Sequence, residues 1–271
     1  KLNDALVNEN TLKYIRNAHL VGGLEFNGKD NLRITVEGYY KKYKNYPISL
    51  RNQISLANLG GGFGVVGNEP VDSRGFGETY GFEILAQKRT LNNFYGIVAY
   101  TFGNSKFSNA NGDLLPSSSD SKHILSLTTG KYFNRNWNVG ARFRLQSGLP
   151  ETPYDLNRSA LVNIWNIANG PVSNFAQLNT LRGNVAHQLD IRAEKKWIFS
   201  KWQFTFYVDV VNVYGSKNAS NLPVVNLQRD ASDNGIIANP NAPQDQQYYL
   251  LDVGKSDRNM PLPYFGFIFE F

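Results

Sequence analysis

Apolar and polar residues alternate with a period of two over several long segments of this chain, and no other feature constrains the fold as strongly. The apolar positions of segment 202–210 are Trp202, Phe204, Phe206, Val208 and Val210. The residues between them are Gln203, Thr205, Tyr207 and Asp209. Because successive side chains of a β-strand point to opposite faces, each such segment predicts a strand with one apolar and one polar face.

Nine segments follow this pattern. They cover residues 17–26, 32–41, 78–89, 94–106, 122–133, 137–147, 187–199, 202–214 and 263–271. Four connections between them are short, and these are 27–31, 90–93, 134–136 and 200–201. They alternate strictly with long connections at about 49–77, 108–121, 150–186 and 216–260, which are rich in Asn, Ser, Gly and Pro.

The strict alternation of short and long connections decides between classes of all-β protein. A water-soluble sandwich has no reason to place every long loop at one end, whereas outer-membrane barrels have short periplasmic turns and long extracellular loops. The sequence therefore predicts an all-β fold, a transmembrane antiparallel up-and-down β-barrel, to which residues 1–271 contribute one unit. We expect the long loops outside the cell outer membrane and the C-terminus on the periplasmic side.

The composition agrees with a barrel wall. Charged residues make up 18% of the chain, against about 25% in soluble domains. The mean hydropathy is negative and no apolar run reaches the length of about 18 residues that a transmembrane helix needs. The net charge is +6, but no basic run exceeds two residues, so the clustered basic face of a nucleic-acid-binding protein is missing. Cysteine is absent, which excludes disulfides and thiolate metal sites.

The last residues of the chain form an aromatic segment. One of its faces carries Phe265, Phe267, Phe269 and Phe271. A soluble domain would not normally end on an uncovered aromatic face, whereas a strand that meets lipid would. The spacing of Gly266, Phe269 and Phe271 resembles the C-terminal strand by which the barrel-assembly machinery recognises bacterial outer-membrane barrels. Tyr264 stands where that strand usually has a polar residue, a mild departure.

Tryptophans give an independent indication of a membrane. Trp137, Trp197 and Trp202 all lie within a few residues of a short turn. An amphipathic ring prefers the level of the lipid headgroups, so these positions are typical of an aromatic girdle at the periplasmic interface.

Nine strands do not complete a barrel, because single-chain bacterial barrels have an even number of strands. The first predicted strand ends in a short turn, so it runs toward the periplasm and the chain starts at the extracellular rim. An open sheet would also expose two unpaired edges to lipid at a cost of several kcal/mol per backbone group. We expect this chain to be the C-terminal portion of a larger barrel, with the earlier strands in a partner, a preceding segment or a cleaved portion.

Several segments together resemble the TonB-dependent outer-membrane receptors, especially those of Bacteroidetes-type bacteria. They are Val36–Pro47, Gly77–Ile84, Val98–Phe102, Ser119–Leu125, Arg144–Pro150, His187–Arg192 and Asp209–Tyr214. Their order and spacing over residues 17–271 carry the resemblance, and they do not identify a substrate.

The resemblance implies a 22-stranded barrel closed by an N-terminal plug, of which this chain would be about the last nine strands. It implies a receptor and not an enzyme, which imports a siderophore, cobalamin or glycan without a cofactor of its own. The implied partners are outer-membrane lipid, the rest of the barrel and its plug, the TonB complex that supplies energy, and the barrel-assembly machinery. A surface lipoprotein over the loops is left open. The alternative is a barrel subunit with a structural or docking role in a larger assembly.

Polar residues on the predicted lumen face are the candidates for ligand contact. They are Arg142, Arg144, Gln146, Asp190, Arg192, Tyr207 and Asp209. Opposite charges on neighbouring strands can pair across the ladder, so pairing with each other, with water or with the plug competes with substrate contact. No nucleophile–base set supports catalysis. Further candidates in the long loops are Tyr154, Trp165, Phe175, Arg182, Tyr248 and Tyr249, which could contact a ligand or pack within the loops.

Two other patterns suggest chemistry that the sequence does not support. His19, His123 and His187 each begin a strand near the same rim, but the last two lie two strands apart. That separation is too large for ligands of one metal at about 2.0–2.1 Å. The segment 62–67 matches a dinucleotide-binding glycine pattern, yet no helical periodicity follows it. We expect neither a metal nor a nucleotide site, and we expect 62–67 to be an extracellular loop.

Overall fold

The computed structural model describes residues 8, 11–29, 31–60, 68–91, 93–216, 219–255 and 259–271, and for residues 89–91 the backbone alone. The glycine-rich segment 62–67 lies outside the described residues. Within them, no helix combines the length and the apolar character that a membrane crossing requires.

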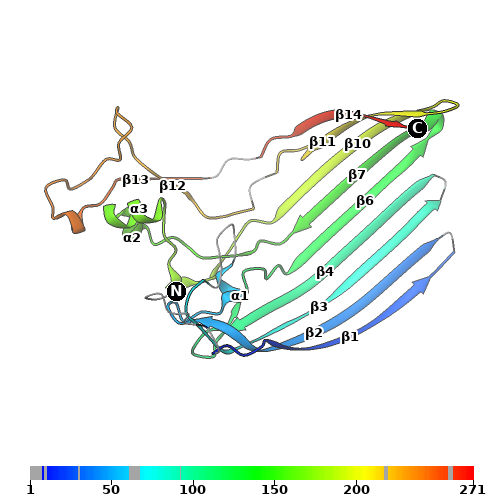
Figure 1. Cartoon of the computed structure of the whole chain (residues 1–271). Coiled ribbons are helices and arrows are strands. Elements are labelled where there is room, and N and C mark those ends of the chain that lie inside the picture. The colour runs from blue at the N-terminus through cyan, green and yellow to red at the C-terminus, as the bar shows by residue number, and fades with distance from the viewer. Residues whose placement is uncertain are drawn as a thin grey trace.

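Nine strands form the continuous path of a ten-stranded sheet, in the order in which they occur along the chain, and a short tenth strand pairs with the fourth of them. They are β1 (Arg16–Asn27), β2 (Leu32–Ser49), β3 (Val71–Leu91), β4 (Phe94–Ser108), β6 (His123–Phe133), β7 (Trp137–Gln146), β10 (Ala186–Ile198), β11 (Gln203–Val211) and β14 (Leu262–Glu270). Each neighbouring pair is antiparallel. Figure 1 shows them side by side in one tilted wall. The predicted all-β fold with an antiparallel up-and-down sheet is confirmed.

Short and long connections lie at opposite ends of the wall, as predicted (Figure 1). In the first short turn, Gly28 donates its backbone N–H to the carbonyl oxygen of Leu32 at 2.8 Å, and Asn31 has a left-handed φ of 56°. In the third, Arg135 and Asn136 have φ values of 60° and 57°. Asparagine adopts this conformation more readily than most residues, which explains why these tight turns are rich in it.

The long connections carry more regular structure than the sequence predicts. Their elements are α1 (Leu56–Leu59), β5 (Leu114–Pro116), β8 (Pro150–Glu151), α2 (Leu156–Ala160), α3 (Val162–Ala168), β9 (Leu181–Arg182), β12 (Val224–Leu227) and β13 (Leu251–Gly254), with two short 3₁₀ turns at 175–177 and 244–246. A third 3₁₀ turn, 134–136, is the short connection between β6 and β7. β3 also begins at Val71, inside the connection expected at 49–77. The reason is irregular pairing around Tyr46, after which Ile48 still pairs with Asp72. Such bulges shift the side-chain period, so alternation alone cannot follow the strand past them.

The buried apolar side chains gather at the end of the wall that carries the long connections. They are Ile48, Ile54, Val71, Phe107, Leu178 and Val225. Along the wall itself large apolar side chains are exposed instead, for example Leu24 at 83% and Phe265 at 68%. The wall therefore has no second layer of the described chain packed against its apolar side.

Aromatic rings form a continuous apolar face across β10, β11 and β14. The ring centroids of Trp197 and Phe204 are 5.3 Å apart, those of Phe204 and Phe269 4.9 Å, and those of Phe206 and Phe267 5.4 Å. Separations of this size are favourable for aromatic pairs. We call this side of the wall the apolar face and the opposite side the polar face.

On the polar face, three tyrosines lie over glycines of the next strand. The pairs are Tyr39 with Gly81, Tyr95 with Gly130, and Tyr207 with Gly266. A Cβ added at Gly130 would come within 2.2 Å of the Tyr95 hydroxyl, and one at Gly266 within 2.4 Å of the Tyr207 hydroxyl. The glycines thus leave room for rings that cover the backbone of the ladder.

Replacing Gly81 by alanine should destabilise the wall, because the added Cβ would lie 2.0 Å from the carbonyl oxygen of Phe102 and 2.8 Å from the hydroxyl of Tyr39. We expect a loss of about 1–3 kcal/mol, as for other overpacked positions. The matched control is Gly22→Ala in β1, where nothing lies within 4 Å of the new Cβ. The measurement is the temperature at which the folded barrel in detergent loses its compact gel mobility. An equal loss of stability in both variants would contradict the close packing of Tyr39 over Gly81.

Candidate lumen-facing site

The seven predicted site residues share the polar face of three neighbouring strands. β7 and β10 provide Arg142, Arg144, Gln146, Asp190 and Arg192, and β11 provides Tyr207 and Asp209. Their common facing follows from the period of two, since each is an even number of residues from the others on its strand. The register places Asp190 opposite Arg142, and Arg192 opposite Asp209.

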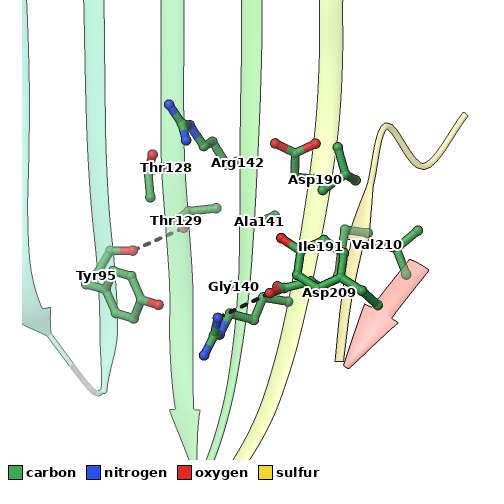
Figure 2. A pocket seen from close by; sticks show the side chains of 13 residues that line it. Tyr95, Thr128, Thr129, Gly140, Ala141, Arg142, Asp190, Ile191, Asp209 and Val210 are labelled. Atoms are coloured by element: carbon green, nitrogen blue, oxygen red, sulfur yellow. Dashed lines mark hydrogen bonds and ion pairs between the residues drawn. The ribbon is translucent and has the colours of Figure 1, made fainter. Parts of the chain in front are cut away.

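A groove of about 310 Å³ runs along this face and includes four of the seven residues. Its polar lining is formed by Tyr95, Thr128, Thr129, Arg142, Asp190, Arg192, Asp209 and Tyr264. Figure 2 shows Arg142, Asp190 and Asp209 projecting from neighbouring strands around it. A second groove of about 270 Å³ takes in Arg144 and Gln146.

Arg192 is held in place from three sides. Its Nε donates to Glu194 Oε2 at 2.9 Å and its Nη1 to Asp209 Oδ2 at 3.2 Å. The guanidinium carbon also lies 3.9 Å from the ring centroid of Tyr207. Two carboxylates and one aromatic face leave this cation little freedom, so Arg192, Asp209 and Tyr207 form a fixed part of the site.

Glu194 and Asn138 extend this cluster beyond the predicted residues. Asn138 donates to Glu194 Oε1 at 3.1 Å, and the Tyr95 hydroxyl lies 3.4 Å from Asn138 Oδ1. Both residues occupy polar-face positions of β7 and β10, opposite each other in the register. The alternation predicts that both side chains lie on the polar face, but nothing in the sequence predicts that Asn138 donates to Glu194.

Asp190 does not pair with the arginine opposite it. Its Oδ1 accepts a hydrogen bond from Gln188 Nε2 at 2.6 Å and one from the backbone N–H of Asn212 at 3.0 Å. Within the described residues, Arg142 and Arg144 form no ion pair and are exposed on the polar face. The site thus combines one neutralised, fixed arginine with two arginines whose charge is available to another molecule or segment.

At the end of the long connections, Asp120 joins two loops. Its carboxylate is buried and pairs with Arg182 from β9 at 2.5 Å and with Lys122 at 3.0 Å. It also accepts from the backbone N–H of Ser105 at 2.7 Å. Burial alone would raise the pKa of Asp120, but these bonds outweigh it and hold the pKa below its usual value. Arg182, a candidate ligand contact, is therefore engaged within the loops.

Two asparagines continue this junction. Asn179 Nδ2 donates to the carbonyl oxygens of Asn58 and Pro116, each at 2.9 Å. Asn58 Nδ2 in turn donates to Leu115 and Pro116 at 2.9 and 2.8 Å. Residues from the connections 49–77, 108–121 and 150–186 are thereby linked, and we call this network, centred on Asp120, Asn58 and Asn179, the loop junction.

The three histidines do not converge on one point. His123 and His187 lie on the apolar face, where Nδ1 of each is hydrogen-bonded to a tyrosine hydroxyl, that of Tyr100 at 2.8 Å and that of Tyr214 at 2.7 Å. His19 lies opposite Lys41 of β2. Among the described residues, no three His, Asp or Glu side chains are grouped so that they could hold a metal ion.

A sheet with strands in sequence order, aromatic on one face and charged on the other, is part of the wall of an antiparallel up-and-down β-barrel. One solved structure with this fold is the closed form of the ferric-catecholate import receptor Fiu from E. coli K12. The match has a TM-score of 0.53 and 12% sequence identity, and covers 97% of this chain but only 29% of that chain. The likeness is one of fold. No family model and no curated protein matches the sequence.

Replacing Asp120 by asparagine should loosen the loop junction. Removing one partner of a buried pair costs about 3–5 kcal/mol, and we expect about 2 kcal/mol here because the Arg182 side chain is 37% exposed and partly solvated without its partner. The measurement is amide hydrogen exchange of residues 114–122 and 178–183.

The same substitution should remove an acid sensitivity. Since the folded-state pKa of Asp120 is lowered, its contribution is present above its unfolded pKa of about 4 and is lost as the pH falls below that value. Exchange in the wild type should therefore speed up below about pH 4, beyond the ordinary pH dependence, whereas Asp120→Asn should show no such step. Asp233→Asn, an exposed carboxylate in the same class of loop, is the control. A step that survives in Asp120→Asn would contradict this assignment.

Proposed function

We propose that this chain is the C-terminal part of the barrel of a TonB-dependent receptor in the bacterial outer membrane, and that the complete protein imports a scarce nutrient. The observation that best supports this is the two-faced wall, with exposed aromatic rings on one side and charged grooves on the other. The fold likeness to Fiu, an import receptor, and the resembling sequence segments agree with it. The proposed complete barrel has 22 strands around a plug and is of the Bacteroidetes type.

In this proposal the apolar face meets outer-membrane lipid and the polar face lines the lumen. The long connections face the outside, either in solvent or beneath a surface lipoprotein, while the short turns and Phe271 lie in the periplasm. Gly266, Phe269 and Phe271 serve the barrel-assembly machinery. The TonB complex drives the rearrangement of the plug, after which the nutrient passes along the lumen. No step is catalytic.

The chemistry of the lumen favours an anionic cargo among the nutrient classes. Arg142 and Arg144 are exposed cations that the described residues do not neutralise, on the same strand and the same face. A ferric siderophore of the catecholate class is anionic and could be attracted by both. Arg192 is held by Glu194 and Asp209 and is better suited to keep the groove in shape.

The test uses the complete receptor in living cells. Uptake of radioactive iron from a ferric catecholate siderophore should require the TonB complex, and should fall about tenfold in Arg142→Gln/Arg144→Gln, since each charge-assisted contact is worth about 1.5–3 kcal/mol before partial compensation. The matched control is Arg135→Gln, an arginine of the short turn 134–136. The amount of folded barrel is measured in parallel.

The outcomes separate the parts of the proposal. Uptake without TonB would contradict energy coupling, and equal uptake by both variants would contradict the role of the two arginines. An intact outer-membrane barrel that imports neither ferric catecholate, cobalamin nor glycan would favour the docking role instead.

A further inference from the structure

Three lysines lie on the apolar face near the short turns, and the side chains around two of them are aromatic. They are Lys88 in β3, Lys131 in β6 and Lys195 in β10, and we call them the lysine belt. The register shows their facing, because Lys131 lies opposite Phe94, and Lys195 opposite both Trp137 and Phe206. A charge on the lipid-facing side of a barrel is costly at the centre of the bilayer and tolerated near its interfaces.

The belt keeps one level along the wall. Lys88 precedes the end of β3 at Leu91 by three residues, and Lys195 precedes the end of β10 at Ile198 by three. Lys131 precedes the end of β6 at Phe133 by two. These strand ends enter the short turns, and the short turns lie at one end of the wall (Figure 1). The three lysines therefore lie near that rim.

Aromatic rings surround two of the belt lysines. Lys195 Nζ lies 5.8 Å from the ring centroid of Trp137 and 5.6 Å from that of Trp197. Lys131 Nζ lies 5.6 Å from the ring centroid of Phe133, which stands opposite Trp137 in the register. The rings of Phe133 and Trp137 are 49% and 45% exposed. Two cations and three open rings thus form one continuous patch across β6, β7 and β10.

The charges of this patch are not used inside the described chain. Neither Lys131 nor Lys195 is within ion-pair distance of a carboxylate of the described residues. The neighbouring Lys196 points to the polar face instead and pairs with Glu270 at 3.4 Å. The adjacent residues Lys195 and Lys196 therefore differ. The charge of Lys196 is neutralised by Glu270, whereas that of Lys195 is available to a molecule outside the described chain.

We propose that Lys131 and Lys195 bind the phosphate of an acidic glycerophospholipid, while Trp137 and Trp197 contact the glycerol region of the same lipid. Lys88 lies at the same rim, outside this patch. Lysine stems can lie along an apolar surface with their ammonium groups at the headgroup level, where tryptophan also prefers to lie. Cationic clusters at that level attract acidic headgroups. This inference rests on the proposed function, because it requires the apolar face to meet lipid.

The opposite rim does not offer the same site. There the apolar face carries Lys42 and Lys106, with Glu78 between them in the register, where it also accepts from the Tyr40 hydroxyl at 3.1 Å. The acid reduces the positive potential around Lys42 and Lys106. Arg16 and Lys44 lie opposite each other on the same face. A phosphate-bearing lipid of the other leaflet, such as lipid A, is therefore a separate arm of the test.

The test compares two double variants of the complete barrel that remove the same charge from the same face. Lys131→Gln/Lys195→Gln changes the belt, and Lys42→Gln/Lys106→Gln changes the other rim. Each protein is reconstituted into vesicles of phosphatidylcholine with phosphatidylglycerol, or with lipid A in a separate arm. After extraction into mild detergent, retained lipids are counted by native mass spectrometry.

We expect the wild type and Lys42→Gln/Lys106→Gln to retain phosphatidylglycerol about fivefold over phosphatidylcholine, and the belt variant to lose this preference. Insertion with no preference in the wild type would overturn the belt as a lipid site and leave the membrane assignment intact. The belt would also be overturned as a lipid site if Lys42→Gln/Lys106→Gln lost the preference for phosphatidylglycerol. The same conclusion would follow if the protein preferred only lipid A and the belt variant kept that preference. Failure to insert into vesicles at all would contradict the proposed function itself.

Discussion

Hydrogen bonding between neighbouring strands is the constraint on which the rest of the structure depends. From β1 to β14 each strand of the wall is antiparallel to the next, so the backbone polar groups between strands are satisfied within the sheet. Side chains are then free to differ between the two faces, and the period of two separates them completely. A single backbone arrangement therefore yields one surface of stacked rings and one of paired charges, which no helix of the described chain could provide.

The wall was predictable from the sequence because its pattern is local. Residues two apart in the sequence indicate which face of a strand is apolar, and a few polar residues indicate each short turn. The nine strands and their order follow directly from these two patterns. The loop junction was not predictable in this way. Asp120 contacts Arg182, which lies 62 residues further along the chain. No period or motif in either segment predicts this contact. β3 was expected to begin later for a related reason, since irregular pairing near Tyr46 hides its first residues from the alternation.

The candidate site shows the same division between what is local and what is not. Alternation places Arg142, Asp190 and Arg192 on the polar face, and the structure agrees. It cannot say which of the facing charges pair, because several donors compete for each carboxylate. Gln188 and the backbone of Asn212 occupy Asp190, so Arg142 stays unpaired, whereas Arg192 finds two carboxylates within reach. Pairing is decided by the side chains two residues away on the same strand as much as by those opposite.

Lys195 and Lys196 show how far this logic extends. They are identical in chemistry and adjacent in sequence, yet the pleat sends one among tryptophans and the other toward Glu270. A charge on the polar face can find a partner within the chain, because that face is rich in acids. Lys195, on the apolar face, has the rings of Trp137 and Trp197 beside it, and a ring attracts a cation without cancelling its charge. An uncompensated cation at the edge of an apolar surface is stable where water and anions meet that surface, which is the boundary of a bilayer and not its interior.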